Sequence, residues 1–272
     1  MTLLLPAAAV VAWRRRAEPG VRFALAWLIP AWVVFEALPT KLPHYLMPAY
    51  GGLAWLAARA LAEPIGVVAR WLGAGLLMAT GLVLAAAVFY LLSLYGGPSD
   101  AWAATVAGGL LAAAGLVGAY LMARQAPQAA LLSSLVLAVL GHAALAAAFA
   151  PRLDPLWLSD RLERALEQTR LLPRQGVAEA PVAVAGFAEP SLVFALGTGT
   201  ELEGPAEAAQ AIVEGRPAIV EQHEEAAFEE ALKTRAGTAV LVARISGINY
   251  SKGDPMTLRV YVAPEVLNEV RR

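Results

Sequence analysis

The residues best suited to chemistry lie in one proline-rich stretch, residues 36–48, with the sequence EALPTKLPHYLMP. Lys41 offers a compact positive charge that suits a phosphate group. His44 and Tyr45 place hydrogen-bonding groups beside it, and Glu36 could pair with Lys41 or assist a metal ion. The types and spacing of these four residues predict contact with a phosphate-bearing substrate.

Three prolines shape the backbone of this stretch, because proline interrupts a helix and holds its predecessor in an extended conformation. Apolar segments flank the stretch, so we expect an irregular backbone at or near membrane depth. Such a backbone is tolerated only when it is buried in protein or lines a polar cavity, and ionisable groups there are functional candidates. The alternative is an interfacial turn in which Lys41 extends towards lipid headgroups and Tyr45 joins an aromatic belt. The residues alone leave both interpretations open.

Long apolar segments place this stretch in a membrane protein. Hydrophobic residues make up 58% of the 272 residues and charged residues 16%, whereas a soluble protein has about 45–50% and about 25%. A spanning helix needs about 20 apolar residues. Five segments reach or approach this length: 21–38, 46–62, 71–95, 104–123 and 129–150. We therefore predict an α-helical membrane bundle over residues 1–151 and a small extracytoplasmic α/β domain over residues 152–272.

A further apolar segment, residues 2–13, is too short to cross a membrane. As a helix it reaches only about 18 Å, against a hydrocarbon core of about 30 Å. A signal peptide would carry its positive charges before the apolar run, but Arg14, Arg15 and Arg16 follow it. We interpret the segment as the inner half of a span whose beginning is missing, and we expect the chain to be the C-terminal portion of a longer protein.

Arginine residues predict the orientation of the spans. They fall in connections on one side, whereas the opposite side carries Lys41 alone, and the positive-inside rule makes the arginine-rich side cytoplasmic. Residues 152–272 then lie outside, in the periplasm if the protein is in a bacterial inner membrane. Residues 1–150 carry a net charge of +4 and the remainder −5, so neither part indicates nucleic acid as a partner. Cysteine is absent, which excludes disulfides, thiolate metal sites and a cysteine nucleophile.

The pattern after residue 152 alternates between helices and strands. Helices are predicted at 161–170, 190–196, 206–213 and 224–234. Strands are predicted at 181–187, 218–221, 238–244 and 257–262. Ser159 and Asp160 are expected to cap the first helix, and Pro190 opens the second. The expected result is a sheet of about three to five strands packed with helices.

Three other features favour ordinary structure over a site. Gly197-Thr198-Gly199 lacks the third glycine of a dinucleotide fingerprint and predicts a turn. His223 has no second histidine four residues on, so it predicts an exposed acidic helix start and no metal site. His142 lies among leucines and alanines, which favours a packed or hydrogen-bonded core histidine over a proton relay.

Three separated motifs resemble those of one known family. They are PTKLPHYLMPAYGGLAWLAARAL in the membrane part, and GFAEPSLVFALG and GINYSKGD in the soluble part. The family comprises the polytopic GT-C glycosyltransferases related to the aminoarabinose–lipid A transferase and the protein O-mannosyltransferases. The resemblance covers most of the chain.

The resemblance implies transfer of a sugar from a polyprenyl-phosphate donor to a lipid or protein acceptor at the outer membrane face, with membrane lipids as further partners. Lys41 and Tyr45 match the family's Lys-Leu-Pro-x-Tyr motif and are implied to contact the phosphate. His44 and Glu36 are carried over as their neighbours. The family's catalytic acid belongs to the first external loop, which this chain would lack, so we expect the chain to be inactive alone. A divalent metal ion in the full-length protein is compatible with the resemblance.

Two other functions stay open. A non-catalytic membrane scaffold or accessory subunit, with a periplasmic domain that binds a partner, is the main alternative. A transporter is the weaker one, because transport sites place polar groups within the spans, and those of this chain are few: Thr80, Ser133, Ser134 and His142.

Overall fold

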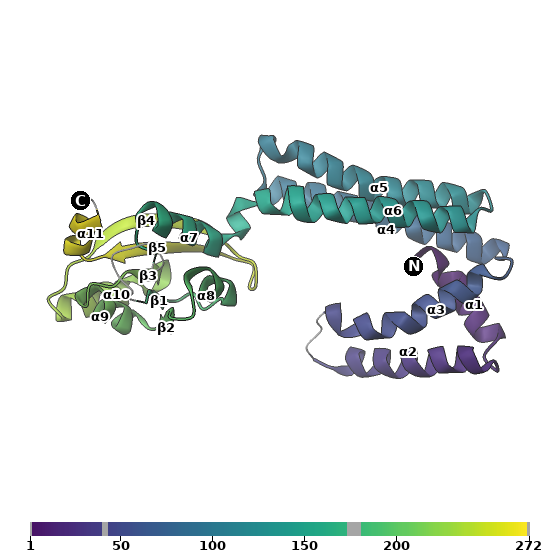
Figure 1. Cartoon of the computed structure of the whole chain (residues 1–272), viewed down its shortest axis with the longest axis horizontal. Helices are drawn as coiled ribbons and strands as arrows, with labels where there is room; N and C mark the ends of the chain where they lie inside the picture. Colours follow the sequence, from purple (N-terminus) through teal and green to yellow (C-terminus); the bar gives the residue numbers. More distant parts are fainter. Residues whose placement is uncertain (1, 40–42, 173–180, 271–272) are drawn as a thin grey trace. The chain divides into compact units, whose positions relative to one another are not determined.

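A computed structural model of the chain describes residues 2–39, 43–172 and 181–270. The chain divides into two compact units, Met1–Arg152 and Leu153–Arg272, which Figure 1 colours from purple to teal and from teal to yellow. Buried apolar residues cluster within each unit separately. Each unit therefore has a core of its own.

The first unit consists of helices joined by short connections. In chain order they are η1 (Thr2–Leu4), α1 (Leu5–Arg14), α2 (Pro19–Ala37), the 3₁₀ segment η2 (Pro43–Ala49), α3 (Tyr50–Leu61), α4 (Val67–Tyr95), η3 (Pro98–Asp100), α5 (Ala101–Ala123) and α6 (Pro127–Ala144). A π-helical turn, η4 (Leu145–Phe149), and a 3₁₀ turn, η5 (Ala150–Arg152), extend α6 to the end of the unit.

Four stretches of the described residues are long and apolar enough to cross a membrane. They are Pro19–Ala37, Val67–Tyr95, Pro98–Ala123 and Pro127–Arg152. The span expected at 46–62 divides instead into η2, which contains Pro48, and the 12-residue helix α3. Proline removes a backbone donor, and 12 residues of α-helix reach only about 18 Å. Four helices meet the criterion where about five were expected, and the helical membrane bundle is confirmed.

Small residues explain how closely α4, α5 and α6 pack, side by side in Figure 1. A Cβ atom on Gly81 of α4 would lie 2.8 Å from the Cα atom of Gly115 of α5, so the two backbones meet there. Small residues at such crossings let membrane helices approach closely. α5 packs against both α4 and α6 and is the middle helix of the three. Its apolar segment is accordingly 39% buried, against 17% in α4 and in α6.

Ion pairs join two of the arginine-bearing connections. Arg15, after α1, approaches Glu63, after α3, to 3.1 Å. Arg59 approaches Glu63 to 2.9 Å and Glu18 to 3.6 Å. The connection between α1 and α2 therefore lies beside the connection between α3 and α4, at one end of the unit.

The second unit is a small α/β domain, as predicted. Its elements are η6 (Asp154–Leu156), α7 (Leu158–Gln168), β1 (Ala183–Ala185), α8 (Pro190–Leu196), β2 (Glu201–Glu203), α9 (Pro205–Val213), β3 (Ala218–Glu221), η7 (Gln222–Glu224), α10 (Glu225–Thr234), β4 (Val240–Asn249), β5 (Asp254–Val262) and α11 (Pro264–Val270). The bounds of α8 and β3 coincide with the predicted ones. β2 and α11 were not predicted, and β2 has only three residues at the edge of the sheet.

The five strands form one sheet in the order β2-β1-β3-β5-β4. β2, β1 and β3 are parallel, β5 runs antiparallel to β3, and β4 and β5 form a hairpin. The chain passes from β1 through α8 to its neighbour β2, and then from β2 through α9 back past β1 to β3. These two crossovers run in opposite directions along the sheet, so right-handed connections place α8 and α9 on opposite faces. α7 packs against α8 and β4, whereas α10 packs against α9 and β3. The sheet therefore has helices on both faces.

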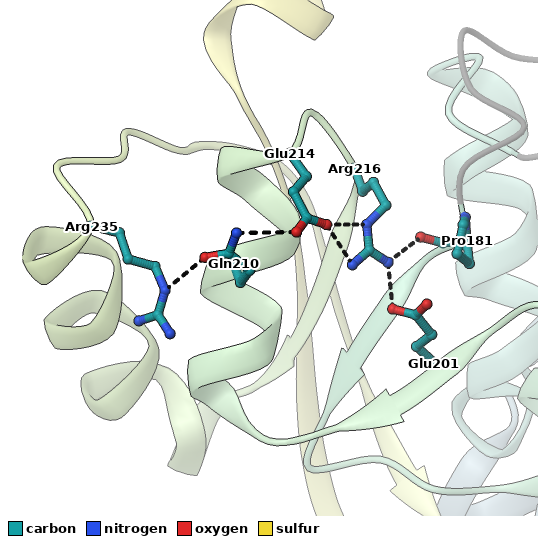
Figure 2. A network of polar contacts seen from close by, with 6 residues as sticks. All are labelled: Pro181, Glu201, Gln210, Glu214, Arg216 and Arg235. Carbon is teal, nitrogen blue, oxygen red and sulfur yellow. Dashed lines mark hydrogen bonds and ion pairs between the residues drawn. The ribbon is translucent and has the colours of Figure 1, made fainter.

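Arg216, after α9, holds the beginning of β1 against β2 (Figure 2). Its Nη1 donates to the carbonyl oxygen of Pro181 at 3.3 Å and pairs with Glu201. Its Nε donates to Glu214 at 3.0 Å, and Gln210 donates to the other oxygen of Glu214 at 3.1 Å. The network thus joins the end of α9 to β2, the strand that precedes it, and to the segment that leads into β1.

The same contacts shift two pKa values. Burial lowers the pKa of Arg216, but its hydrogen bonds to Glu201 and Glu214, and their charges, outweigh this effect and raise it. The hydrogen bonds from Gln210 and then Arg216 lower the pKa of Glu214. The charged form of each side chain is therefore favoured in the folded domain.

Candidate functional site

The structure describes three of the four residues predicted to bind substrate. Glu36 lies in the last turn of α2, and His44 and Tyr45 lie in η2. Lys41 lies outside the described residues, so its proximity to the other three stays a prediction.

Prolines determine where the helices on either side begin and end. Leu38 precedes Pro39 and has a ψ angle of 139°, which is extended and stops α2. Pro43 begins η2, where its missing N–H is tolerated, and α3 begins at Tyr50, shortly after Pro48. The described part of residues 36–48 therefore interrupts the helices, as the proline spacing predicts.

Ring contacts fix Tyr45 within this stretch. Its ring centroid lies 5.5 Å from that of Phe35 in α2 and 5.0 Å from that of His44, the latter in an edge-on arrangement. Tyr45 is half-buried, whereas His44 and Glu36 are exposed. The structure thus brings Tyr45 and His44 together and places Tyr45 against the residue that precedes Glu36.

This geometry leaves polar groups available for a ligand. A held phenol and an exposed imidazole can both donate hydrogen bonds to phosphate oxygens. Among the residues that the structure describes, no group of three or more His, Asp or Glu side chains could hold a metal ion.

The other features from the sequence have local explanations. Gly197 ends α8 with a φ angle of +105°, which confirms the turn there. The His223 side chain is 86% exposed, and its Nδ1 lies 2.9 Å from Glu221. His142 is exposed, so its expected place in a core was wrong, whereas the expected hydrogen bond is present. Its Nδ1 lies 2.7 Å from the carbonyl oxygen of Ala138 in the same helix.

A second candidate site is a cavity of about 240 Å³ in the second unit. Three segments line it: the beginning of α7, the stretch from β1 through α8, and the end of β4 with the following turn. Its lining residues are Leu156, Trp157, Leu158, Ser159, Asp160, Glu163, Phe187, Glu189, Ser191, Phe194, Ala195, Ile248, Asn249 and Tyr250. Two of the motifs that resemble the GT-C family, GFAEPSLVFALG and GINYSKGD, therefore meet around one cavity.

Hydrogen bonds hold these three segments together. The Oγ atoms of Ser159 in α7 and Ser191 in α8 lie 2.9 Å apart. Ser251 donates to Glu189 at 3.1 Å, and its backbone N–H donates to Asn249 Oδ1 at 3.0 Å. The expected capping role of Ser159 was therefore wrong. α7 begins at Leu158, its N-cap Trp157 makes no side-chain capping bond, and Ser159 bonds another helix instead.

The cavity's aromatic residues were not predicted as site residues. Phe194 is 91% exposed on α8, which is unusual for a phenylalanine in a folded domain. The sequence signal for Phe194 was its place in GFAEPSLVFALG, one of the motifs that resemble the GT-C family. No periodicity distinguishes an exposed phenylalanine from a buried one in a helix as short as α8.

Comparison with known proteins shows the fold alone. No family model matches the chain, and no curated protein matches its sequence. The crystal structure of ArnT from Cupriavidus metallidurans in the apo state is similar, with a TM-score of 0.55 and 17% sequence identity. The match covers 94% of this chain and 50% of the ArnT chain, so the chain spans about half the length of that protein. The four apolar helices and the likeness together indicate a membrane protein whose fold is similar to that of about half of the ArnT chain.

Proposed function

We propose that the chain serves lipid-linked sugar transfer, moving a glycosyl group from polyprenyl phosphate to a lipid or protein acceptor at the periplasmic face of a bacterial inner membrane. In this proposal residues 152–272 form a periplasmic domain. The observation that carries the proposal is the likeness of 94% of the chain to ArnT, an aminoarabinose–lipid A transferase of the GT-C fold. The Lys41–Tyr45 motif supports it independently.

The reaction breaks the bond between the anomeric carbon and the phosphate oxygen and joins that carbon to the acceptor's hydroxyl oxygen. The departing phosphate gains negative charge, which Lys41 would stabilise while Tyr45 donates a hydrogen bond. Glu36 precedes the Lys41–Tyr45 motif and His44 lies within it, and both would position these groups.

The acceptor's proton requires a base. On the side opposite the arginines, the membrane part offers only Glu36 and Asp100 as carboxylates. Asp100 accepts the N–H of Gly97 at 2.8 Å and so caps a turn. We therefore propose the activity for a protein in which another carboxylate supplies the base.

The substitution Lys41→Ala tests the proposal in the protein as its genome encodes it. We expect loss of sugar transfer from polyprenyl-phosphate donors, because the departing phosphate loses its countercharge, while the protein still inserts and elutes as a single species. Native mass spectrometry should also show weaker binding of polyprenyl phosphate.

Lys233→Ala is the matched control, since Lys233 lies on α10 in the second unit. It should leave transfer and lipid binding unchanged. Normal turnover in Lys41→Ala would contradict the proposal. Polyprenyl-phosphate binding that is equal in both variants would favour the scaffold alternative, which needs no phosphate site.

A further inference from the structure

The cavity of the second unit has aromatic walls that are open to solvent. Phe194 is 91% exposed, Tyr250 57% and Trp157 38%, and the buried Phe187 also lines the cavity. Leaving large apolar side chains in water is unfavourable, and grouped exposure of this kind marks a binding site. The three exposed rings belong to three different segments of the chain, so the tertiary fold brings them together.

The charges on the lining are all of one sign. Asp160, Glu163 and Glu189 line the cavity, and its described lining residues include no lysine, arginine or histidine. Two arginines of α7 make contacts here. Arg164 pairs with Asp160 and offsets its charge, so the attraction for a cation comes from Glu163 and Glu189. Arg161 donates to the carbonyl oxygen of Ser246 at 2.7 Å. The lining therefore complements a positive charge and disfavours an anion.

The size of the cavity limits the ligand. Its volume of about 240 Å³ is below the range of about 300–1,000 Å³ that drug-sized ligands occupy. A protein partner would need a broad surface of roughly 800 Å² on each side, whereas the apolar residues here surround a pocket. A compact molecule with one apolar group fits better.

We propose that this cavity binds a small organic cation with an apolar body, of the arylalkyl-ammonium or alkyl-ammonium class. The body lies against Phe194, Tyr250 and Trp157, and the ammonium group faces the carboxylates of Glu163 and Glu189. Aromatic faces attract cations within about 6 Å, so the same walls serve both parts of the ligand. All residues that line the cavity belong to the second unit, and the proposed ligand is a cation, whereas the sugar donor carries a phosphate.

Phenethylamine is a suitable probe, with phenethyl alcohol as a neutral analogue of similar size. Binding to the full chain in lipid nanodiscs is measured by ligand-observed NMR, with empty nanodiscs subtracted. We expect saturable binding of one amine per chain, about tenfold tighter than binding of the alcohol, and weaker at high salt. Equal affinity for amine and alcohol would overturn the proposal.

Variants locate the binding. Phe194→Ala and Glu189→Gln should each weaken amine binding by about fivefold or more, and Glu163→Gln gives a second test of charge that spares the Ser251 contact. Glu229→Gln, on the exposed face of α10, should leave it unchanged, as should Lys41→Ala. Hydrogen exchange of β1 and β3 checks that each variant is folded. Amine affinity unchanged in all three cavity variants, with exchange as in the parent, would also overturn the proposal.

Discussion

The two candidate sites differ in how the chain assembles them. In the first unit, the candidate substrate-binding residues lie between positions 36 and 45, in a stretch whose prolines interrupt the helices on either side. In the second unit, the cavity draws its lining from positions 156 to 250, and hydrogen bonds between helices and turns bring those segments together. The first site is local in sequence, whereas the second depends on the fold.

This difference determines how each site responds to change elsewhere. A local site loses function when its own side chains change, and distant packing affects it little. An assembled site is sensitive to any contact that positions its segments, even one that does not touch the ligand. Three substitutions separate these two behaviours.

Arg216→Ala should have the largest effect on stability. Its side chain is only 15% exposed, and its removal takes one donor from each of Glu201, Glu214 and the Pro181 carbonyl, although Gln210 still donates to Glu214. We expect a loss of about 1–3 kcal/mol in the free energy of unfolding of the second unit. Hydrogen exchange of peptides from β1 and β2 measures this loss. Because β1 leads to Phe187 and Glu189, amine binding should also weaken, while lipid-phosphate binding stays unchanged.

Arg164→Ala is the matched control, because this arginine is 51% exposed and pairs at the surface. Its effect should stay within about 0.5 kcal/mol. Equal effects of the two substitutions would show that the Arg216 network does not position β1.

Tyr45→Phe should have an intermediate effect, confined to the first unit. The substitution keeps the ring contact with Phe35 and removes only the hydroxyl. If that hydroxyl donates to a phosphate, polyprenyl-phosphate binding should weaken by about tenfold, which is the lower end of the roughly 1.5–3 kcal/mol that hydrogen bonds to charged groups contribute. Native mass spectrometry compares it with Tyr50→Phe, an exposed tyrosine at the start of α3 that should have no effect. Parent-like binding in Tyr45→Phe, with loss in Tyr45→Ala, would limit Tyr45 to a packing role.

Glu214→Gln should have the smallest effect, and one that depends on pH. The pKa of Glu214 is lowered in the folded domain, so its contribution to stability is complete above its ordinary value of 4.5 and is lost as the pH falls through the lowered value. The difference in melting temperature between parent and variant should therefore shrink between about pH 7 and about pH 3. Glu229→Gln serves as control. A difference that is constant with pH would mean that the carboxylate's charge does not stabilise the domain.

Much of the fold follows from local patterns in the sequence. Long apolar runs predict the helices of the membrane bundle, and Pro190 with its following residues predicts α8 with correct bounds. Pro48 argues against a single helix over 46–62, since it removes a backbone hydrogen-bond donor near the beginning of that segment. The edge strand β2 has three residues and partly exposed side chains, so neither length nor alternation marks it.

The two sites divide in the same way. The Lys41–Tyr45 stretch could be singled out as a candidate from residue types, because charge, hydrogen-bonding groups and prolines coincide within it, although residue types did not exclude an interfacial turn. The cavity could not be singled out in this way, because Ser159, Ser191 and Ser251 have partners that are far away in sequence. Phe194 is of a residue type that is usually buried, yet it is exposed. Tertiary pairing of this kind leaves no periodic signal.

Photo-crosslinking tests the proposed phosphate site most directly. A polyprenyl phosphate with a photoreactive group beside the phosphate is bound to the full chain in nanodiscs, irradiated, and mapped by mass spectrometry. The proposed site predicts crosslinks within residues 36–48 that disappear with excess unlabelled polyprenyl phosphate and weaken in Lys41→Ala. Competable crosslinks found only in the second unit, or only on helices away from this stretch, would contradict it.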